Sequence, residues 1–152
     1  MKLAIDLGGT NIRIAQVAEG KCLKRNSVAC LATQDVDVIL TQLFELIEPM
    51  IGETVEGIGI GVPSIVDTVH GIVYDAKNIA SWKEVHLKEL LEEKFGLPVA
   101  VNNDSNCFAL GESLFGSGRL YENMVGITIG TGIGLGIIIH HSLYGGGYAG
   151  AG

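Results

Sequence analysis

The stretch Asp6-Leu7-Gly8-Gly9-Thr10-Asn11 places one acid and two adjacent glycines between two apolar runs. Lys2–Leu7 and Ile12–Val17 are rich in strand-forming residues, so the pattern predicts two strands joined by a tight turn. The turn has two interpretations. It is a plain hairpin turn capped by Asp6, or it is a phosphate cradle. Glycines without a Cβ let an anion approach backbone N–H groups, and they make a positive φ available. This motif alone does not decide between the two.

A second glycine turn, Gly130-Thr131-Gly132-Ile133-Gly134, lies between the predicted strands Met124–Ile129 and Leu135–Ile139. Its glycines recur with period two and therefore share one face of a strand. A face without side chains admits either another backbone, which is ordinary close packing, or a phosphate. Because both turns carry Thr beside the glycines, we favour two halves of a nucleotide clamp over two unrelated turns.

The third feature is the polar cluster Asn102-Asn103-Asp104-Ser105, between a predicted strand at Val99–Val101 and a predicted helix at Asn106–Phe115. One interpretation is a helix N-cap, where Asn and Asp are favoured. The other is a ligand site, because α/β folds bind ligands at the carboxyl ends of strands. A carboxylate placed here can accept the proton of a hydroxyl that attacks a phosphoryl group. With two glycine turns, the cluster completes a set for phosphoryl transfer.

The remaining pattern alternates strands with helices, and the order mixes a meander with parallel crossovers. This predicts an α/β fold with a mixed sheet. Helical spacing predicts that Asn106–Phe115 turns Cys107, Leu110, Leu114 and Phe115 inward. Further elements are expected as an edge strand at Cys22–Ala29, a helix at Asp35–Met50, a buried strand at Val55–Val62, a short hairpin or an extended insertion at Ile65–Asp67 with Gly71–Tyr74, and a helix at Val85–Phe95 ended by Gly96.

Composition restricts the class of protein. The chain has 152 residues, 47% of them hydrophobic and 18% charged, which suits one globular core. Its net charge of −7 argues against a nucleic-acid partner. Three cysteines without a C-x-x-C spacing predict a reduced, cytoplasmic protein. The longest apolar run, Ile133–Ile139, is too short to span a bilayer, so we expect no membrane partner.

Taken together, five stretches resemble the ROK family of sugar kinases. That family belongs to the actin/hexokinase/Hsp70 ATPase superfamily with its ribonuclease-H-like fold. The resemblance covers nearly the whole chain, in order and in spacing. It is specific as a combination, although each motif alone is not. The stretches are DLGGTN (6–11), GVPSIVD (61–67), NIASW (78–82), LPVAVNNDSN with ALGE (97–112) and ITIGTGIGLGIII (127–139).

The resemblance implies a fold and an activity. The fold is a ribonuclease-H-like lobe with a mixed five-stranded sheet flanked by helices (residues 1–122), followed by the first hairpin of a second lobe (123–152). The activity is ATP-dependent phosphorylation of a hexose or N-acetylhexosamine hydroxyl, the 6-OH, as in glucokinases. ATP and Mg²⁺ are the implied cofactors, and a homo-oligomer is expected.

The resemblance also assigns roles to residues. Asp104 matches the catalytic base, and Ser64, Asn78 and Asn103 match sugar-binding positions, with Ser64 a departure from the usual glycine. Asp6 is further expected to hold Mg²⁺ through bound water. The positions that match the ATP phosphate motifs are Asp6, Gly8, Gly9, Thr10, Asn11, Gly130, Thr131, Gly132 and Gly134.

Two departures from the family pattern set the alternatives. The chain stops at Gly152, where the family continues into an E-x-G-H motif and a cysteine segment that binds structural zinc. We therefore expect an amino-terminal portion that is inactive alone, with zinc only in a longer parent chain. The alternatives are a non-catalytic sugar-binding module and a ROK-type transcriptional regulator, which would carry an added DNA-binding helix-turn-helix. A first strand at Lys2 and the acidic charge disfavour the regulator.

Overall fold

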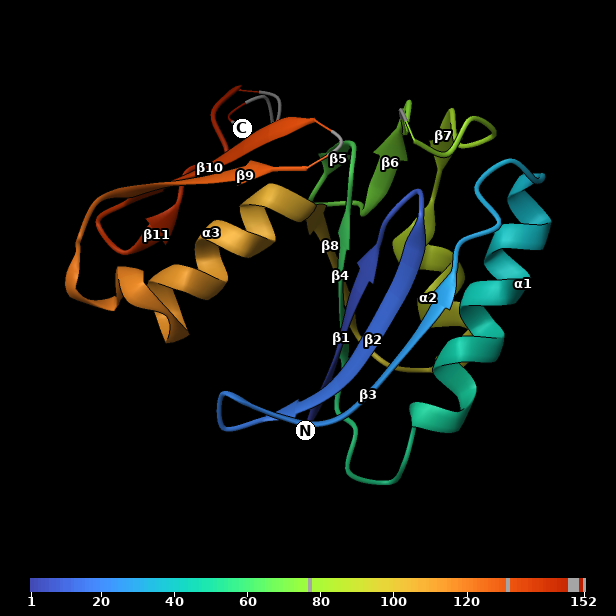
Figure 1. The fold of residues 1–152 in the computed structure, drawn as a ribbon. Coiled ribbons are helices and arrows are strands. Elements are labelled where there is room, and N and C mark those ends of the chain that lie inside the picture. The colour runs from blue at the N-terminus through green and yellow to red at the C-terminus, as the bar shows by residue number, and fades with distance from the viewer. Residues whose placement is uncertain (77, 131, 148–150, 152) are drawn as a thin grey trace.

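The computed structural model describes residues 1–76, 78–130, 132–147 and 151. A mixed five-stranded sheet forms the centre, and helices lie on both of its sides (Figure 1). The strands run in the order β3-β2-β1-β4-β8, which confirms the expected α/β sheet. Their bounds are β1 Lys2–Leu7, β2 Asn11–Ala18, β3 Lys21–Ala29, β4 Ile58–Val62 and β8 Val99–Asn103.

The central sheet combines two kinds of pairing. β1, β2 and β3 form an antiparallel meander, whereas β4 pairs in parallel with β1 and with β8. β3 is exposed along most of its length and occupies the edge, as its polar sequence predicts. The expected strand at Val55–Val62 starts only at Ile58, because Gly52–Val55 closes a turn by a backbone hydrogen bond of 2.9 Å.

The hydrophobic core lies between one face of this sheet and two helices, α1 (Val36–Ile47) and α2 (Leu87–Phe95). Alternate residues of each central strand point into it, so Leu3, Ile5 and Leu7 are buried while Ala4 is exposed. A short 3₁₀ turn, η1 (Glu48–Met50), extends α1 to the end of the predicted helix. No helix in the described ranges is long and apolar enough to cross a membrane.

A small sheet covers one end of the core and consists of β5 (Ile65–Asp67), β6 (Ile72–Tyr74) and β7 (Glu84–Val85). The predicted hairpin of β5 and β6 is confirmed. The predicted helix start at Val85 is wrong. Val85 lies in β7 and pairs with Val73 of β6, and the helix begins at Leu87. Trp82, just before β7, is fully buried in the core.

The third sheet is the hairpin of β9 (Met124–Ile129) and β10 (Ile133–Ile139) with the short β11 (Ser142–Leu143). Helix α3 (Asp104–Phe115) packs mainly against this hairpin and touches the central sheet at β4 (Figure 1). The 3₁₀ turn η2 (Ser117–Leu120) follows α3.

The predicted inward face of α3 is wrong. Leu114 and Phe115 are 51% and 63% exposed, Cys107 is classed as exposed, and Leu110 is only half-buried. The hairpin turns glycines toward the helix, and a Cβ at Gly136 would lie 2.6 Å from the Cβ of Ala109. Only small side chains fit such a contact, so size and not hydrophobicity selects the buried face. The buried residues of α3 are Ser105, Asn106, Ala109 and Ser113.

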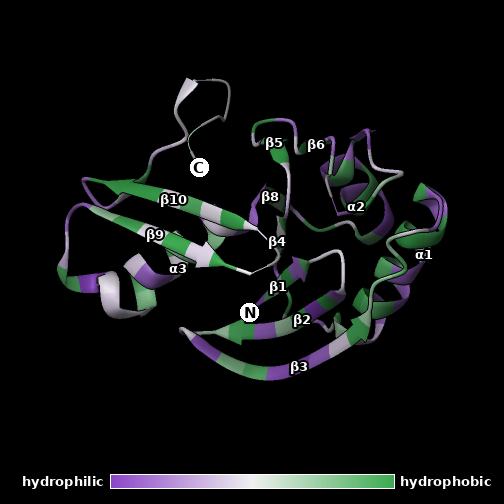
Figure 2. Cartoon of the chain, turned by 45° about the horizontal axis from the view of Figure 1, so that its top comes forward, coloured by the Kyte–Doolittle hydropathy of each residue, from purple (hydrophilic) through white to green (hydrophobic). Residues whose placement is uncertain are grey.

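The other face of the β9–β10 hairpin is apolar and open to solvent. Ile129 and Ile133 are 83% and 79% exposed, and Val125 and Ile127 are more than half exposed. Figure 2 shows both strands coloured largely as hydrophobic.

Gly96 supplies a test of the helix ends. It ends α2 with φ of +65°, and a Cβ at this position would meet no atom within 4 Å. We expect Gly96→Ala to lower the free energy of unfolding by about 1 kcal/mol, because the left-handed region costs an L-residue roughly 1–2 kcal/mol. The measurement is urea unfolding followed by Trp82 fluorescence.

Gly52→Ala is the matched control. Its Cβ would also meet no atom within 4 Å, but its φ lies outside the left-handed region, so alanine fits there. We expect no destabilisation, since alanine also restricts the unfolded chain. Equal losses in the two variants would contradict this account of Gly96.

Candidate functional site

A row of three residues crosses the central sheet at the carboxyl ends of β1, β4 and β8. Asp6 is in register with Gly61, and Gly61 with Asn102. Neighbouring strands lie about 4.8 Å apart, so Asp6 and Asn102 flank the glycine on the face opposite the core. The first turn of α3 covers this glycine, because a Cβ on Gly61 would lie 3.4 Å from the Cα of Asp104 and from the Sγ of Cys107. The row therefore brings Asp6 and Asp104 to one region.

The start of α3 is fixed by the side chain of Asn103. Its Oδ1 accepts from the backbone N–H of Ser105 at 2.9 Å and of Asn106 at 3.2 Å, which is an N-cap. Its Nδ2 donates to the carbonyl of Ser64 at 3.1 Å. Asn103 thus serves as an N-cap, as one interpretation of the polar cluster expects, and among the described residues its amide nitrogen donates only to Ser64.

The DLGGTN turn is closed by the Gly8 N–H, which donates to the Asn11 carbonyl at 2.9 Å. Neither Gly8 nor Gly9 has a positive φ, so the positive φ that glycine makes available is not used here. A Cβ on Gly9 would instead lie 2.5 Å from the Cβ of Asn78 and 2.7 Å from its carbonyl oxygen. The structure thus brings a predicted phosphate turn against a predicted sugar-binding residue, and close packing explains the glycine at position 9.

Asp6 pairs with the cation opposite it in the β1–β2 ladder. Arg13 Nη1 donates to Asp6 Oδ2 at 2.8 Å, and the two residues are partners in the register. Both side chains are about half exposed, so this pair contributes at most about 1 kcal/mol. Such a weak pair leaves the Asp6 carboxylate accessible to a hard cation, which prefers oxygen ligands.

The second glycine turn has an open part and a packed part. The Gly130 N–H donates to the Gly132 carbonyl at 2.9 Å, and apart from its chain neighbours no described residue has an atom within 4 Å of a Cβ on either glycine. Gly134, in contrast, is in tight contact, because a Cβ there would overlap Ser105 Oγ and lie 2.9 Å from Thr128 Oγ1. Gly130 and Gly132 therefore leave room for an anion, whereas Gly134 makes room for a helix. Thr131 lies outside the described residues.

Ser64 follows β4, and its hydroxyl donates to the Tyr74 carbonyl. This bond ties the start of the small sheet to β6, so the hydroxyl already has a partner. The other residues predicted for the first phosphate motif, Thr10 and Asn11, lie at the tip of the β1–β2 hairpin, and the Thr10 carbonyl accepts from the Cys30 N–H at 2.9 Å.

A polar hollow of about 330 Å³ opens beside the cap of α3. It lies between the small sheet, the α3 start and the segment after β10, and amide side chains form its wall next to Asp104. Its volume is that of a small-molecule site. The lining residues are Val66, Thr68, Asn102, Asn103, Asn106, Leu143, Gly145 and Gly146.

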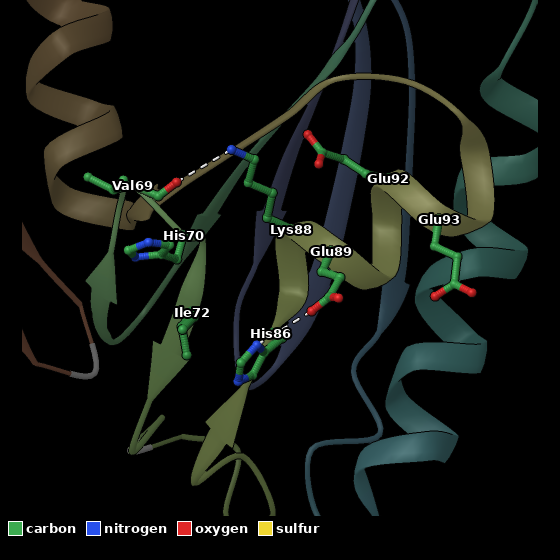
Figure 3. Close-up of a pocket in the computed structure, with 8 residues that line it drawn as sticks. All are labelled: Val69, His70, Ile72, His86, Lys88, Glu89, Glu92 and Glu93. Atoms are coloured by element: carbon green, nitrogen blue, oxygen red, sulfur yellow. Dashed lines mark hydrogen bonds and ion pairs between the residues drawn. The ribbon is translucent and has the colours of Figure 1, made fainter.

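A larger hollow of about 700 Å³ lies elsewhere, between α2 and the small sheet, and Figure 3 shows its residues. Several of its charged side chains already have partners. His86 Nδ1 lies 3.5 Å from Glu89 Oε2, and Lys88 Nζ donates to the Val69 carbonyl at 3.4 Å. It includes none of the residues predicted for the site, so size alone does not make it a candidate.

A metal-binding cluster is not found in the part of the chain that the structure describes, since no group of three His, Cys, Asp or Glu side chains converges there. A cation bound by a carboxylate of this site would therefore take its remaining ligands from water or from the oxygens of a bound molecule. Asp6 and Asp104 are the two carboxylates at the Gly61 row.

The pKa of the Cys107 thiol depends on the charges in this region. Part of its side chain reaches solvent, but the sulfur lies against the backbone of β4 at Gly61. Desolvation of the thiol raises the pKa of Cys107 to about 11, and the negative charges of Asp104 and Asp6 contribute to this rise. Both carboxylates thus act on the same sulfur, which supports their convergence at the Gly61 row.

Comparison with known proteins agrees with this geometry. The model of the ROK family matches residues 2–152. The chain belongs to the ROK family. It is 36% identical over 140 residues to the glucokinase of Thermotoga maritima, and the aligned region covers 91% of this chain and 44% of that protein. It is 38% identical over 125 residues to the xylose repressor of Caldicellulosiruptor bescii, with 77% of this chain and 31% of that protein covered.

Among solved structures, a ROK family glucokinase from Streptomyces griseus in complex with glucose and AMPPNP superposes with a TM-score of 0.87. The identity is 37%, and the match covers 95% of this chain and 46% of that one. The mixed sheet with its helices is therefore the actin-like ATPase fold of ROK sugar kinases. This ROK chain spans less than half the length of each of these three relatives.

Sequence reasoning included Ser105 in the polar cluster without giving it a role, and it did not single out Thr128 or Asn106 as parts of the candidate site. Ser105 and Asn106 are buried, and Asn106 Nδ2 donates to Asn102 Oδ1 at 3.3 Å. The available signal was the row of small and polar residues 105, 109 and 113, spaced by four along α3. That spacing marks one face of a helix.

The thiol of Cys107 gives a direct test of the two carboxylates in this ROK chain. With a pKa of about 11, roughly one thiol in a thousand is ionised at pH 8, so Cys107 should be alkylated far more slowly than the exposed Cys22. Asp104→Asn removes a charge that raises this pKa, so iodoacetamide labelling of Cys107 at pH 8 should become several-fold faster. Peptide mass spectrometry measures both rates.

Glu93→Gln is the control, because Glu93 is an exposed acid on α2 and does not act on Cys107. It should leave the labelling rate unchanged. Equal rates in the Asp104→Asn variant and the unmodified protein would show that the carboxylate does not face the thiol.

Proposed function

We propose that the protein containing this chain phosphorylates a hexose or an N-acetylhexosamine with ATP, as a glucokinase-like enzyme. The observation that carries the proposal is the meeting of Asp104 and Asp6 at the Gly61 row, whose third member, Asn102, also lines the polar hollow. The glucokinase relative and the glucose and AMPPNP complex support the same activity.

In this proposal Asp104 is the general base. It takes the proton from the attacking sugar hydroxyl, the 6-OH, while Asn103, Asn78 and Ser64 form the sugar side of the site. The position of Asp104 at the end of a parallel strand and the start of a helix suits this role. The amide nitrogen of Asn103 has a second N–H that no described residue accepts, and this N–H is the proposed donor to a sugar oxygen. The Ser64 hydroxyl already donates to the Tyr74 carbonyl, so the proposed role of Ser64 is to shape the loop.

The phosphate side is formed by the two glycine turns. Gly8, Gly9, Thr10 and Asn11 are proposed to face the phosphates from β1–β2, and Gly130, Thr131, Gly132 and Gly134 from β9–β10. Gly130 and Gly132 leave open space for a phosphate, because no described residue other than their chain neighbours comes within 4 Å of a Cβ there. Mg²⁺ bound through water at Asp6 would supply charge neutralisation for the transferred group.

The proposed enzyme has two lobes, of which residues 1–122 form the first and 123–152 begin the second. It acts in the cytoplasm. It forms a homo-oligomer, for which the exposed apolar face of β9–β10 offers surface. Structural zinc is expected only in a longer parent chain.

A transcriptional regulator is the second candidate, because the xylose repressor match covers 77% of this chain. A non-catalytic sugar-binding module is a third. Turnover of a sugar panel with ATP by the complete protein separates the enzyme from both, and sugar-dependent binding to DNA identifies the regulator.

Asp104→Asn in the complete protein tests the base. We expect kcat to fall by about 10²- to 10⁴-fold, the usual contribution of a general base, and the sugar Kd to change little. A coupled ADP assay measures the first and calorimetry the second. Asp37→Asn, an exposed acid at the start of α1, is the control and should keep kcat. Near-normal turnover by Asp104→Asn would remove the proposed role.

The 152-residue chain by itself should show weak sugar binding at best and no turnover. The reason is that it spans less than half the length of its glucokinase relative. Calorimetry with glucose and with ATP, followed by an ADP assay, checks this. Clear kinase activity of the isolated chain would contradict it.

A further inference from the structure

Ser105 is a buried hydroxyl directly after Asp104, and only 4% of this residue is exposed. Its Oγ lies 2.8 Å from Thr128 Oγ1 on β9 and 3.3 Å from Asp104 Oδ1. These contacts link the carboxylate at the start of α3 to a strand of a different sheet. Thr128 lies two residues before Gly130, so the link runs from Asp104 to the strand that enters the second glycine turn.

The direction of the hydrogen bonds follows from counting protons. A carboxylate only accepts, and each hydroxyl has one proton to donate. If Ser105 donates to Asp104, the proton between the two hydroxyls must come from Thr128. The chain then runs from Thr128 to Ser105 to Asp104, and hydrogen bonds in such a series strengthen one another.

The two oxygens of Asp104 differ in what they accept. Oδ1 accepts from the Ser105 N–H at 2.7 Å as well as from the Ser105 hydroxyl. For Oδ2, the structure records no hydrogen bond among the described residues. The lone pairs of Oδ2 are therefore the ones available to a substrate hydroxyl.

Gly134 makes the hydroxyl pair possible. It stands opposite Thr128 in the β9–β10 ladder, and a Cβ at this position would overlap Ser105 Oγ and lie 2.9 Å from Thr128 Oγ1. The glycine thus has a definite function in the packed structure, which is to leave space for the Ser105–Thr128 contact.

We propose that Ser105 and Thr128 are positioning residues that hold Oδ1 of Asp104 from β9 and so direct Oδ2 toward the reacting hydroxyl. The proposal rests on the proposed role of Asp104 as the base. Neither hydroxyl touches the substrate. Each acts through Asp104, and the link makes the position of the base depend on the strand that leads into the glycine turn.

Three variants of the complete protein test the pair. Ser105→Ala and Thr128→Val each remove one hydroxyl, and Val is close to Thr in shape. Each should lower kcat about 10- to 100-fold and leave the sugar KM within about twofold, because a misplaced base slows the chemical step without removing a sugar contact. Thr128→Ser keeps the hydroxyl and should restore most of the lost kcat.

The double variant Ser105→Ala with Thr128→Val should be no slower than the worse single variant, since both remove the same link. Ser113→Ala is the matched control. It deletes another buried hydroxyl of α3, outside the Ser105–Thr128 pair, and should leave kcat unchanged. Circular dichroism and thermal unfolding confirm that each variant is folded. If Ser105→Ala does not fold, the comparison of Thr128→Val with Thr128→Ser decides alone.

The proposal is overturned if folded Thr128→Val keeps kcat within about threefold, if Thr128→Ser is as slow as Thr128→Val, or if the two losses add. These outcomes can be told apart from failure of the proposed function. If the proposed function is wrong, the Asp104→Asn variant keeps its turnover. If Asp104→Asn is inactive but Thr128→Val is fully active, only the role of the Ser105–Thr128 pair is refuted.

Discussion

The contact between α3 and the glycines around it holds the candidate site together. Gly61 admits the first turn of the helix on one side, and Gly126 and Gly136 admit Ala109 on the other. A Cβ added at Gly126 or at Gly136 would lie 2.9 Å or 2.6 Å from the Cβ of Ala109, which is too close. Overpacking of this kind typically costs about 1–3 kcal/mol. The helix that starts with Asp104 is therefore fixed between two sheets by the absence of side chains.

The charges at this site explain what else a phosphoryl-transfer role would require. Asp6 and Asp104 both raise the pKa of Cys107, and Arg13 is the cation paired with Asp6. A phosphate brought here would meet two carboxylates, so it needs positive potential from elsewhere. Backbone N–H groups of the glycine turns and a bound cation are the sources that such a site can use.

Much of the fold follows from sequence periodicity. Alternating apolar residues predicted the positions of β1, β2 and β4, and the polar sequence of β3 predicted its place at the edge of the sheet. The inward face of α3 could not be predicted this way, because its partner surface is made of glycines. Hydrophobic patterns assume that large apolar residues point inward, but against a glycine surface Ala109 and Ser105 fit and Leu114 does not.

Some features of the candidate site could likewise be predicted from the sequence, and others could not. Its residue types and their order were evident from the motifs, since strand ends and turns gather polar side chains. The causes at single positions were not evident. Gly9 and Gly134 each border another side chain, Asn78 and Ser105 respectively, and such long-range contacts have no local signal in the sequence. The N-cap was partly evident, because a cap within the polar cluster was one of its two interpretations, but the helix begins at Asp104 instead of the predicted Asn106 and the cap is Asn103.

The contact between Gly9 and Asn78 holds the turn of residues 8–11 close to the loop that contains Asn78. The backbone at position 9 is so close to residue 78 that the turn cannot shift toward this loop unless the loop shifts too. A side chain at position 9 would therefore push the two loops apart, so their present spacing depends on the glycine.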